Sequence, residues 1–392
     1  MMTTELRPTS WIELSETALR ANLKFLRRVI GGPAVFCSVV KADAYGHRIA
    51  NYIPLAEKCG VRDFAVFSAG EASKVLEART RSSSIMIMGS IDDQDLGWAI
   101  ENEIAFFVFD LARLDAAIRT AKKLGRRAQV HLEVETGLLR TGFSESGLKT
   151  ALRHLAANPR WVEAVGLCTH FCGAESSASF YRITEQFEIF RRRAAQIAQA
   201  GHSDLKQHVA CSAAIFNYPD SVLDLVRVGI AQYGYWPSEE TRLSYLHRGA
   251  RRQKASSLRL VRVLAWKCRV MSLKVAAPGA FIGYGLSYQA FRKMRLATVP
   301  VGYSHGFPRA QSNVGHVLIH GQRCRVVGTV NMNMLTVDVT DLDGVRPGDE
   351  VVLIGRQGDE EISVGAFGEQ THNLNYEVLV RISAHIPRVV VP

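Results

Sequence analysis

The sequence predicts an α/β fold in which a parallel (β/α)8 barrel of the TIM type is followed by a mostly β C-terminal domain. Short apolar segments alternate with segments of helical periodicity through the first 230 residues, which is typical of parallel βαβ units. Beyond residue 260, runs of β-branched residues separated by turn residues replace that alternation. We therefore place the barrel domain at residues 10–245 and the β domain at residues 246–392.

The number of strand candidates indicates a closed barrel. Two of the segments between them, Thr17–Ile30 and Tyr181–Ala200, carry apolar residues at spacings of three and four, which predicts amphipathic helices. Eight parallel units favour a barrel, and an open doubly wound sheet is the alternative. The eight predicted strands are Val35–Val40, Phe64–Phe67, Ile85–Met88, Ile104–Val108, Ala128–Val134, Ala164–Cys168, Gln207–Ala210 and Leu225–Val228.

The second domain begins after a basic stretch. Arg248–Arg262 holds six basic residues and no acidic ones. It could bind nucleic acid, but few aromatic residues are interleaved to stack on bases, so a linker or a dimer contact is the favoured interpretation. The predicted strands beyond it are Leu260–Val270, Leu296–Val301, His316–Ile319, Cys324–Val330, Leu335–Val339 and Glu350–Ile354.

Composition excludes several classes of protein. Of the 392 residues, 47% are hydrophobic and 22% are charged, which is typical of globular domains and not of disordered, collagen-like or coiled-coil chains. No apolar run approaches the roughly 18 residues of a membrane span, and Met1–Trp11 does not resemble a secretory signal. The seven dispersed cysteines form no CxxC pair. We expect a cytoplasmic protein with reduced thiols and no membrane association.

Chemically useful residues follow the predicted barrel strands at their C-terminal ends, where the active sites of such barrels lie. The net charge of +11 also favours an anionic ligand. We expect these residues to share one face of the barrel. They are Lys41, Glu133 to Arg140, His170, Ser212, Arg227, Gly229 and Ile230.

Lys41 follows an unbroken apolar run, so its amine would emerge from a buried strand end. A desolvated lysine has a lowered pKa and can form a Schiff base with an aldehyde. The alternative is a lysine whose amine simply reaches solvent. Ser212 and the Gly229–Ile230 turn could bind a phosphate on the same face. Together these features favour pyridoxal phosphate as the cofactor.

An ordered set of motifs resembles the alanine racemase family, and the resemblance covers nearly the whole chain. It implies a fold-type III pyridoxal-phosphate enzyme that interconverts L- and D-alanine, a peptidoglycan precursor, as a cytoplasmic homodimer with active sites shared between subunits. The matching segments are Val40–His47, Glu135–Gly142, Thr169–Phe171, Ser212–Ala214, Val226–Gly234, Gly283–Gly285, Val299–Tyr303, Gly328–Met332 and Asn375–Glu377.

The resemblance implies two catalytic bases. Lys41 would hold the cofactor covalently and act as one base, and Tyr284 from the second subunit would be the other. Arg227 would face the pyridine nitrogen, with His170 supporting it. An arginine does not release its proton, so that nitrogen would stay unprotonated, which favours reprotonation at Cα over transamination.

The remaining roles implied by the resemblance concern phosphate and substrate. Arg140 would lie near the phenolic oxygen of the cofactor and the substrate carboxylate, and the backbone amide of Met332 would meet that carboxylate. No metal site is expected. The residues that resemble the family's phosphate contacts are Tyr45, Ser212, Gly229 and Ile230.

Four positions depart from the family pattern and concern substrate choice. Glu133 stands where many relatives carry a lysine that is often carbamylated, Asn333 and His305 replace aspartates, and Ala384 replaces an entrance tyrosine. Loss of the aromatic ring could widen the site. Alanine is the expected substrate, and a broader racemase acting on serine, lysine or arginine is the alternative.

Other functions remain open at this point. A decarboxylase or lyase could use the same fold, although Gly283–Tyr284–Gly285 argues against it. A cofactor-carrier protein would lack the β domain, and a nucleic-acid binder is suggested only by charge. Cys168, His170 and Cys172 could be imagined as a metal site, but a second ligand pair at zinc spacing is missing.

Overall fold

The computed structural model describes residues 7–249, 259–371 and 374–392 and divides the chain into two compact units. The barrel unit comprises Ala18–Ala44 and Tyr52–Val261, and the β unit comprises the residues up to Thr17 together with Tyr45–Asn51 and Arg262–Pro392. The units therefore interleave along the chain, whereas the predicted boundary separates two continuous domains. The reason is strand pairing, because β1 (Ser10–Ser15) pairs with strands from the C-terminal third.

The barrel unit contains eight parallel strands in the order β8-β7-β6-β5-β4-β3-β2-β9. Strands β8 and β9 complete the ring, since the Arg227 amide donates to the Ala210 carbonyl at 3.0 Å and Cys211 forms a bridge with Arg227. The predicted barrel is confirmed, and each predicted strand lies within two residues of an observed one. Their bounds are β2 Val35–Val39, β3 Asp63–Val66, β4 Ser84–Ile87, β5 Ala105–Val108, β6 Ala128–Glu133, β7 Val162–Cys168, β8 Lys206–His208 and β9 Leu225–Val228.

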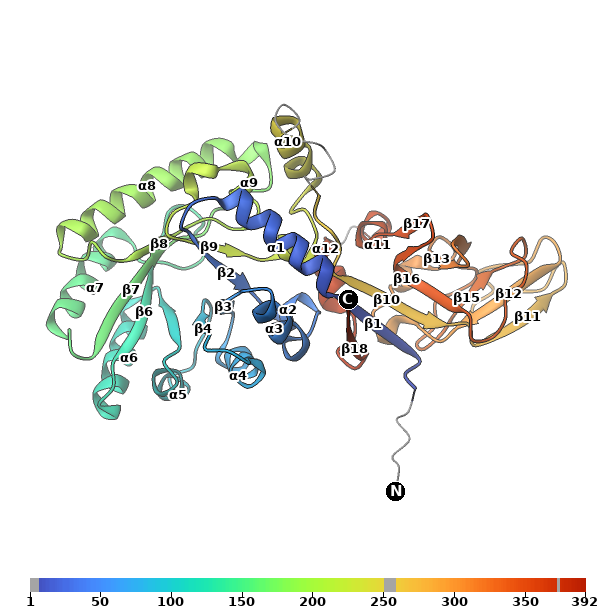
Figure 1. Ribbon diagram of the computed structural model, residues 1–392, viewed down its shortest axis with the longest axis horizontal. Helices are drawn as coiled ribbons and strands as arrows, with labels where there is room; N and C mark the ends of the chain where they lie inside the picture. The colour runs from blue at the N-terminus through green and yellow to red at the C-terminus, as the bar shows by residue number, and fades with distance from the viewer. Residues whose placement is uncertain (1–6, 250–258, 372–373) are drawn as a thin grey trace, which may run out of the picture. The chain divides into compact units, whose positions relative to one another are not determined.

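Helices surround the barrel strands on their outer side (Figure 1). The helical periodicity predicts the first of them correctly: α1 (Glu16–Ile30) buries Leu19, Leu23 and Leu26, each contributing about 1.5–3 kcal/mol. Gly31 and Gly32 end this helix with φ of +63° and +56°. The others are α3 Ile49–Lys58, α4 Ala69–Ala78, α5 Leu96–Glu101, α6 Leu111–Leu124, α7 Glu145–Ala157, α8 Phe180–Gln199, α9 Ala214–Asn217 and α10 Glu239–Gly249. The segment α2, Lys41–Tyr45, is a left-handed turn after β2.

The β unit contains two sheets. One has the strand order β14-β13-β16-β10-β1-β18, with β17 paired to β16, and the other has the order β11-β12-β15. Short helices α11 and α12 follow β17. The bounds are β10 Leu264–Arg269, β11 Ser272–Ala276, β12 Met294–Val299, β13 His316–Ile319, β14 Gln322–Arg325, β15 Leu335–Asp338, β16 Glu350–Gln357, β17 Glu360–Ile362, α11 Val364–Thr371, α12 Asn375–Arg381 and β18 Arg388–Val391.

The sequence prediction was incomplete in this unit. It missed β1, β11, β17 and β18, which are short or carry charged residues. It also made two strands too long: the predicted Leu260–Val270 shortens to β10, and the predicted Cys324–Val330 shortens to β14. Val326 forms a bridge with Val337 instead, and Gly328 has a φ of +79°, so the chain leaves the first sheet there.

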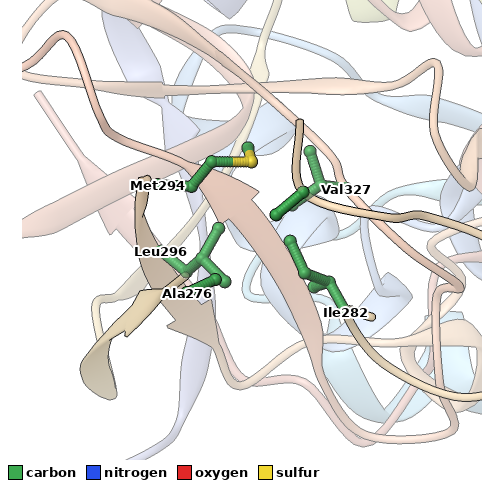
Figure 2. Close-up of a cluster of buried hydrophobic side chains, with 6 residues drawn as sticks. Ala276, Ile282, Met294, Leu296 and Val327 are labelled. Carbon is green, nitrogen blue, oxygen red and sulfur yellow. The ribbon is translucent and has the colours of Figure 1, made fainter. Parts of the chain in front are cut away.

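A small apolar core fixes the loop that carries Tyr284. Ile282 and Val327 pack with residues of β11 and β12 in a buried cluster, and Figure 2 shows their side chains converging. Ile282 is 5% exposed, so the loop is anchored two residues before Tyr284. The cluster consists of Ala276, Ile282, Ala290, Met294, Leu296 and Val327.

The short segment Tyr45–Asn51 is bonded to the end of the chain within the β unit. The Arg388 guanidinium donates to the Gly46 carbonyl at 2.8 Å, and Arg48 donates to the Ala384 carbonyl at 2.6 Å. Gly46 has a φ of +78°, and a β-carbon there would overlap the Leu379 carbonyl. Only glycine fits this contact.

Two predictions can be compared with the described ranges only in part. Most of the basic stretch Arg248–Arg262 lies outside them. Within them, no helix combines the length and the apolar character needed to cross a membrane. All seven cysteines are described and none forms a disulfide.

Candidate active site

Lys41 stands at the end of β2 and begins a left-handed turn. Ala42, Asp43 and Ala44 have φ of 53°, 52° and 57°, and the Ala44 amide donates to the Val40 carbonyl at 2.8 Å. This conformation costs about 1–2 kcal/mol per residue for non-glycine residues. Such strain persists only where the surroundings enforce it, and it concentrates at functional sites.

Glu71, in the first turn of α4, helps to hold this left-handed conformation. Its Oε1 accepts the Ala42 amide at 2.6 Å, and its Oε2 accepts the Phe67 amide at 2.8 Å. The Glu71 amide in turn donates to Ser68 at the helix N-cap. One carboxylate therefore fixes the backbone directly after Lys41, a role that the sequence analysis missed.

The Lys41 amine has a lowered pKa. The residue as a whole is exposed, but desolvation around its amine and the positive charge of Arg140 lower that pKa, while Glu71 acts in the opposite direction. The neutral amine is the nucleophilic form. A lowered pKa is the direction that a Schiff-base lysine requires.

Arg140 lies in the loop after β6, beside a buried carboxylate. Its Nη2 is 4.0 Å from Glu133 Oε1, and its side chain is 59% exposed. Burial raises the pKa of Glu133, while a hydrogen bond from Thr141 and the charges of Arg140 and Arg227 partly offset that effect. The exposed guanidinium can meet a ligand carboxylate while Glu133 restrains its other side.

His170 follows β7 and is surrounded by cations. Burial, followed by the charges of Arg227, Arg140 and Lys41, lowers its pKa to about 3. The ring is therefore neutral at ordinary pH. Three like charges act on one imidazole, so this rim of the barrel strongly favours an anion.

Arg227 on β9 is held by acceptors on one side. Its Nη1 donates to His208 Nδ1 and to the His208 carbonyl at 2.5 and 2.7 Å, and its Nη2 donates to the carbonyls of Thr169 and Val209 at 2.7 and 3.4 Å. A guanidinium has five N–H donors. Across the described parts of the chain, the Nε–H is the donor that no bond uses.

The support of Arg227 differs from the prediction. The imidazole that accepts from Arg227 is that of His208, and no hydrogen bond between Arg227 and the ring of His170 is found in the described residues. His208 lies inside the predicted strand Gln207–Ala210, as His131 does in Ala128–Val134. A polar residue in an apolar strand is the only sequence signal that could have identified them.

Ser212, Gly229 and Ile230 form a turn after β8 and β9. Ser212 Oγ accepts the amides of Gly229 and Ala231 at 2.8 and 3.4 Å, so the Gly229 amide, which the sequence analysis assigned to a phosphate, is engaged by Ser212. The Ile230 amide is buried, and no acceptor for it lies in the described ranges. This amide and the Ser212 hydroxyl proton suit an anion.

Tyr284 lies at the tip of a hairpin in the β unit. Its side chain is 75% exposed, and the flanking Gly283 and Gly285 have φ of +75° and +77°. The Thr329 hydroxyl donates to the Tyr284 carbonyl at 3.1 Å. The phenol is thus presented outward from a fixed backbone.

Met332 also lies in the β unit, with its carbonyl accepting both the amide and the hydroxyl of Ser304 at 3.0 and 2.7 Å. Asn333 Nδ2 donates to the same hydroxyl at 3.0 Å, and His305 Nδ1 lies 3.3 Å from it. Two of the departures from the family pattern therefore meet at one side chain. The Met332 amide has no acceptor among the residues described.

Tyr45 is 6% exposed, and its ring lies 6.0 Å from that of Tyr376 within the β unit. The structure thus places the predicted residues in two groups. Lys41, Arg140, His170, Ser212, Arg227, Gly229 and Ile230 belong to the barrel unit, and Tyr45, Tyr284 and Met332 belong to the β unit.

The site chemistry of the barrel unit is that of an anion-binding centre with a nucleophilic amine. In the parts of the chain that the structure describes, no group of three or more His, Cys, Asp or Glu side chains could hold a metal ion. The model of the alanine racemase N-terminal domain matches residues 14–237, and that of the alanine racemase C-terminal domain matches residues 263–390. The chain belongs to the alanine racemase family.

Individual alanine racemases are similar over their whole length. That of Leptospira interrogans is 32% identical, with 98% of this chain and 96% of the relative covered. That of Symbiobacterium thermophilum is 35% identical, with 98% and 97% covered. The solved alanine racemase of Bacillus anthracis, which carries bound L-Ala-P, has a TM-score of 0.89 at 29% identity, with 99% and 96% covered. These similarities agree with the barrel and β architecture predicted for the family.

Proposed function

We propose that this chain is a pyridoxal-phosphate-dependent racemase that interconverts L- and D-alanine. The observation that carries the proposal is the set of basic groups at the ends of the barrel strands: Lys41 follows β2, the exposed Arg140 follows β6, and Arg227 lies on β9 with its Nε–H unused among the described residues. A phosphorylated aldehyde and an amino-acid carboxylate are the anions that such a rim and its amine would bind. Membership of the alanine racemase family supports the same reaction.

The residues present fit the cofactor. The Lys41 amine would hold it covalently, and the Ser212 hydroxyl and the Ile230 amide would bind its phosphate, together with Tyr45 and the Gly229 turn. The unused Nε–H of Arg227 would meet the pyridine nitrogen. When bound, pyridoxal phosphate delocalises negative charge from Cα of the substrate.

Two bases on opposite faces of the substrate would complete the reaction. The Lys41 amine, with its lowered pKa, would exchange a proton with Cα on one face, and the Tyr284 phenol would do so on the other. Tyr284 is exposed on a fixed hairpin, which suits a residue contributed to a second subunit. We therefore propose a homodimer with shared sites.

Substrate binding would use the carboxylate of the amino acid. Arg140, restrained by Glu133, would bind it together with the Met332 amide. Alanine is the proposed substrate. The small side chain of Ala384 and the Asn333–Ser304 contact are the features that would admit a larger substrate if one is accepted. The cysteines form no disulfide in the described residues, which is consistent with a cytoplasmic location.

The test is a racemisation assay with one enantiomer. The purified chain is given pyridoxal phosphate and L-alanine, and D-alanine is measured by chiral chromatography, with serine, lysine and arginine in parallel. We expect conversion to the racemate without CO2 or amine, whereas release of either would indicate a decarboxylase or lyase. Lys41→Ala should lose both conversion and the visible absorbance of the bound cofactor, while Lys149→Ala, an exposed lysine on α7, should keep both.

A further inference from the structure

Two imidazoles lie in series behind Arg227 inside the barrel. Arg227 Nη1 is 2.5 Å from His208 Nδ1, and His208 Nε2 is 2.9 Å from His131 Nδ1. Arg227, His208 and His131 are 5%, 0% and 6% exposed. A continuous hydrogen-bonded chain therefore crosses from β9 through β8 to β6 without reaching bulk water.

The arginine fixes where each ring carries its proton. A guanidinium only donates, so His208 Nδ1 must accept. The single proton of a neutral His208 is then on Nε2, where it is donated to His131 Nδ1. Burial and the charge of Arg227 lower the pKa of both rings, that of His131 to about 3, so both stay neutral at ordinary pH.

The neighbouring strands are shaped to hold the His131 ring. A β-carbon on Gly166 of β7 would overlap His131 Nδ1, so glycine is required for the ring to lie there. The register of β6 with β7 shifts between Val130 and His131. The Phe107 ring on β5 lies 5.9 Å from each imidazole. The backbone of β7 and a side chain of β5 thus fix the ring against His208.

We infer that His131 is a positioning residue, which acts on the proposed pyridine-facing Arg227 by accepting the Nε2–H of His208 and so holding that ring in place. This inference rests on the proposed function for the role of Arg227, but the tautomer is a property of the chain itself. Without His131 Nδ1, the Nε2–H of His208 has no acceptor. The ring is then held from one side only and can turn, which would break its hydrogen bond with Arg227 Nη1.

Loss of that bond would release the guanidinium on one side. Its Nη2 would still donate to the carbonyls of Thr169 and Val209, so the guanidinium would stay in the site but could rotate about these two bonds. The Nε–H would then no longer point in one fixed direction. A misplacement of about 1 Å near a reacting group can cost up to about 100-fold in rate.

The experiment uses three variants of the holoenzyme without substrate. His131→Leu removes the acceptor and stays apolar. His131→Asn restores an acceptor, because its Oδ1 can occupy the place of Nδ1. Phe107→Leu is the control, since it alters packing against both rings and leaves every hydrogen bond of the chain intact. The primary measurement is NMR of 15N-histidine-labelled protein, which gives the tautomer of His208 and the hydrogen-bond shift of its Nε2–H proton.

We expect the Nε2–H tautomer of His208 throughout. Its Nε2–H proton should be shifted downfield by a hydrogen bond in the wild type, in His131→Asn and in Phe107→Leu, and should lose that shift in His131→Leu. Conversion of alanine should fall about tenfold or more in kcat/KM in both directions for His131→Leu, and stay within about threefold for His131→Asn. An Nδ1–H tautomer in the wild type would overturn the inference without any variant. So would an unchanged shift of the Nε2–H proton in His131→Leu.

The outcomes separate this inference from the proposed function. If the wild type does not racemise alanine, the proposed function fails, and the NMR measurement of the Nε2–H proton still decides whether His131 fixes His208. If the wild type racemises alanine and His131→Leu keeps its kcat/KM, the positioning role alone fails. Should His131→Leu not fold, the wild-type tautomer and the activity of His131→Asn remain decisive, because a loss of activity in His131→Asn with the hydrogen-bond shift kept would overturn it.

Discussion

Glu133 Oε1 lies 4.0 Å from Arg140 Nη2, and this ion pair has one buried and one exposed partner. Burial raises the pKa of the Glu133 carboxyl above its usual range, with Thr141, Arg140 and Arg227 acting against the shift. The protein thus keeps a carboxylate where its ionised form is disfavoured. Such a residue is retained for function and not for stability.

Glu133→Gln should lower activity and raise stability. A raised pKa in the folded state contributes stability that is fully present below the unfolded pKa and is lost as pH rises through the folded value. A permanently neutral glutamine avoids that loss, so the free energy of unfolding at pH 7 should increase. Activity should fall about tenfold in kcat/KM, because Arg140 loses its charged partner.

Denaturant unfolding and chiral assays at pH 7 measure both effects. The matched control is Glu163→Gln, which breaks the exposed pair of Glu163 with Arg127 at 3.3 Å. Such surface pairs contribute about 0–1 kcal/mol, so neither quantity should change much. A Glu133→Gln variant that loses stability at pH 7 would contradict the argument.

Tyr284→Phe should keep the cofactor but lose interconversion in at least one direction. The hydroxyl is the only group removed, and the side chain is exposed on its hairpin, so folding should be unaffected. Loss of a general acid or base costs about 10²–10⁴-fold. Tyr181→Phe, in which the exposed fraction of the original side chain is 86%, is the control. Full activity of Tyr284→Phe in both directions would exclude the two-base scheme.

Periodicity predicts the barrel well because each element's own residues determine it. The strand Leu225–Val228 is predicted with its observed bounds, because three of its four residues are apolar and the turn-forming residues Asp224 and Gly229 flank it. Strand β1 is not predicted, because the strands that it pairs with, β10 and β18, are far from it in the sequence. No local pattern reports such pairing.

The same limit applies to the candidate site. Lys41 and Arg227 stand at strand ends, where topology alone predicts function. His131, His208 and Glu71 act through partners from other strands and loops, as in the bonds of Glu71 to Ala42 and Phe67. Their roles follow from contacts between residues far apart in sequence, which a single sequence does not contain.

Glu71→Ala should loosen the turn after Lys41. It leaves the amides of Ala42 and Phe67 without the carboxylate acceptor that they share, which costs about 1–3 kcal/mol for each group that water cannot reach. The left-handed residues would then relax, and Lys41 would lose its fixed position. We expect a lower melting temperature and weaker retention of pyridoxal phosphate on dialysis.

The control for this change lies on the same helix. Glu77 of α4 is exposed and accepts only from Ser73, at 3.1 Å, so Glu77→Ala should leave both the melting temperature and cofactor retention close to wild type. Glu71→Gln keeps one carbonyl acceptor, so its melting temperature and cofactor retention should lie between those of Glu71→Ala and Glu77→Ala. Equal melting temperatures for Glu71→Ala and Glu77→Ala would show that the carboxylate does not support the turn.

Glu57 should make stability depend on pH in the opposite sense to Glu133. It is 1% exposed, with Oε2 accepting the amide and hydroxyl of Thr80 at 2.6 and 2.7 Å and Oε1 accepting the Ser83 hydroxyl at 2.5 Å. Burial acts to raise its pKa, but the hydrogen bonds from Ser83 and Thr80 outweigh it and lower the pKa. The stability that it contributes is therefore present above the unfolded pKa of about 4.3 and is lost as pH falls through the folded value.

Glu57→Gln should consequently destabilise the chain at pH 7 by about 1–3 kcal/mol, because one side of the amide donates where the carboxylate accepted. The difference from wild type should shrink as the pH is lowered below about 4.3, where the wild-type carboxyl takes up its proton. Denaturant unfolding at pH 7 and pH 4 measures it, with the exposed Glu185→Gln on α8 as control. A difference that stays constant between the two pH values would mean that packing, and not the charge on Glu57, determines the loss.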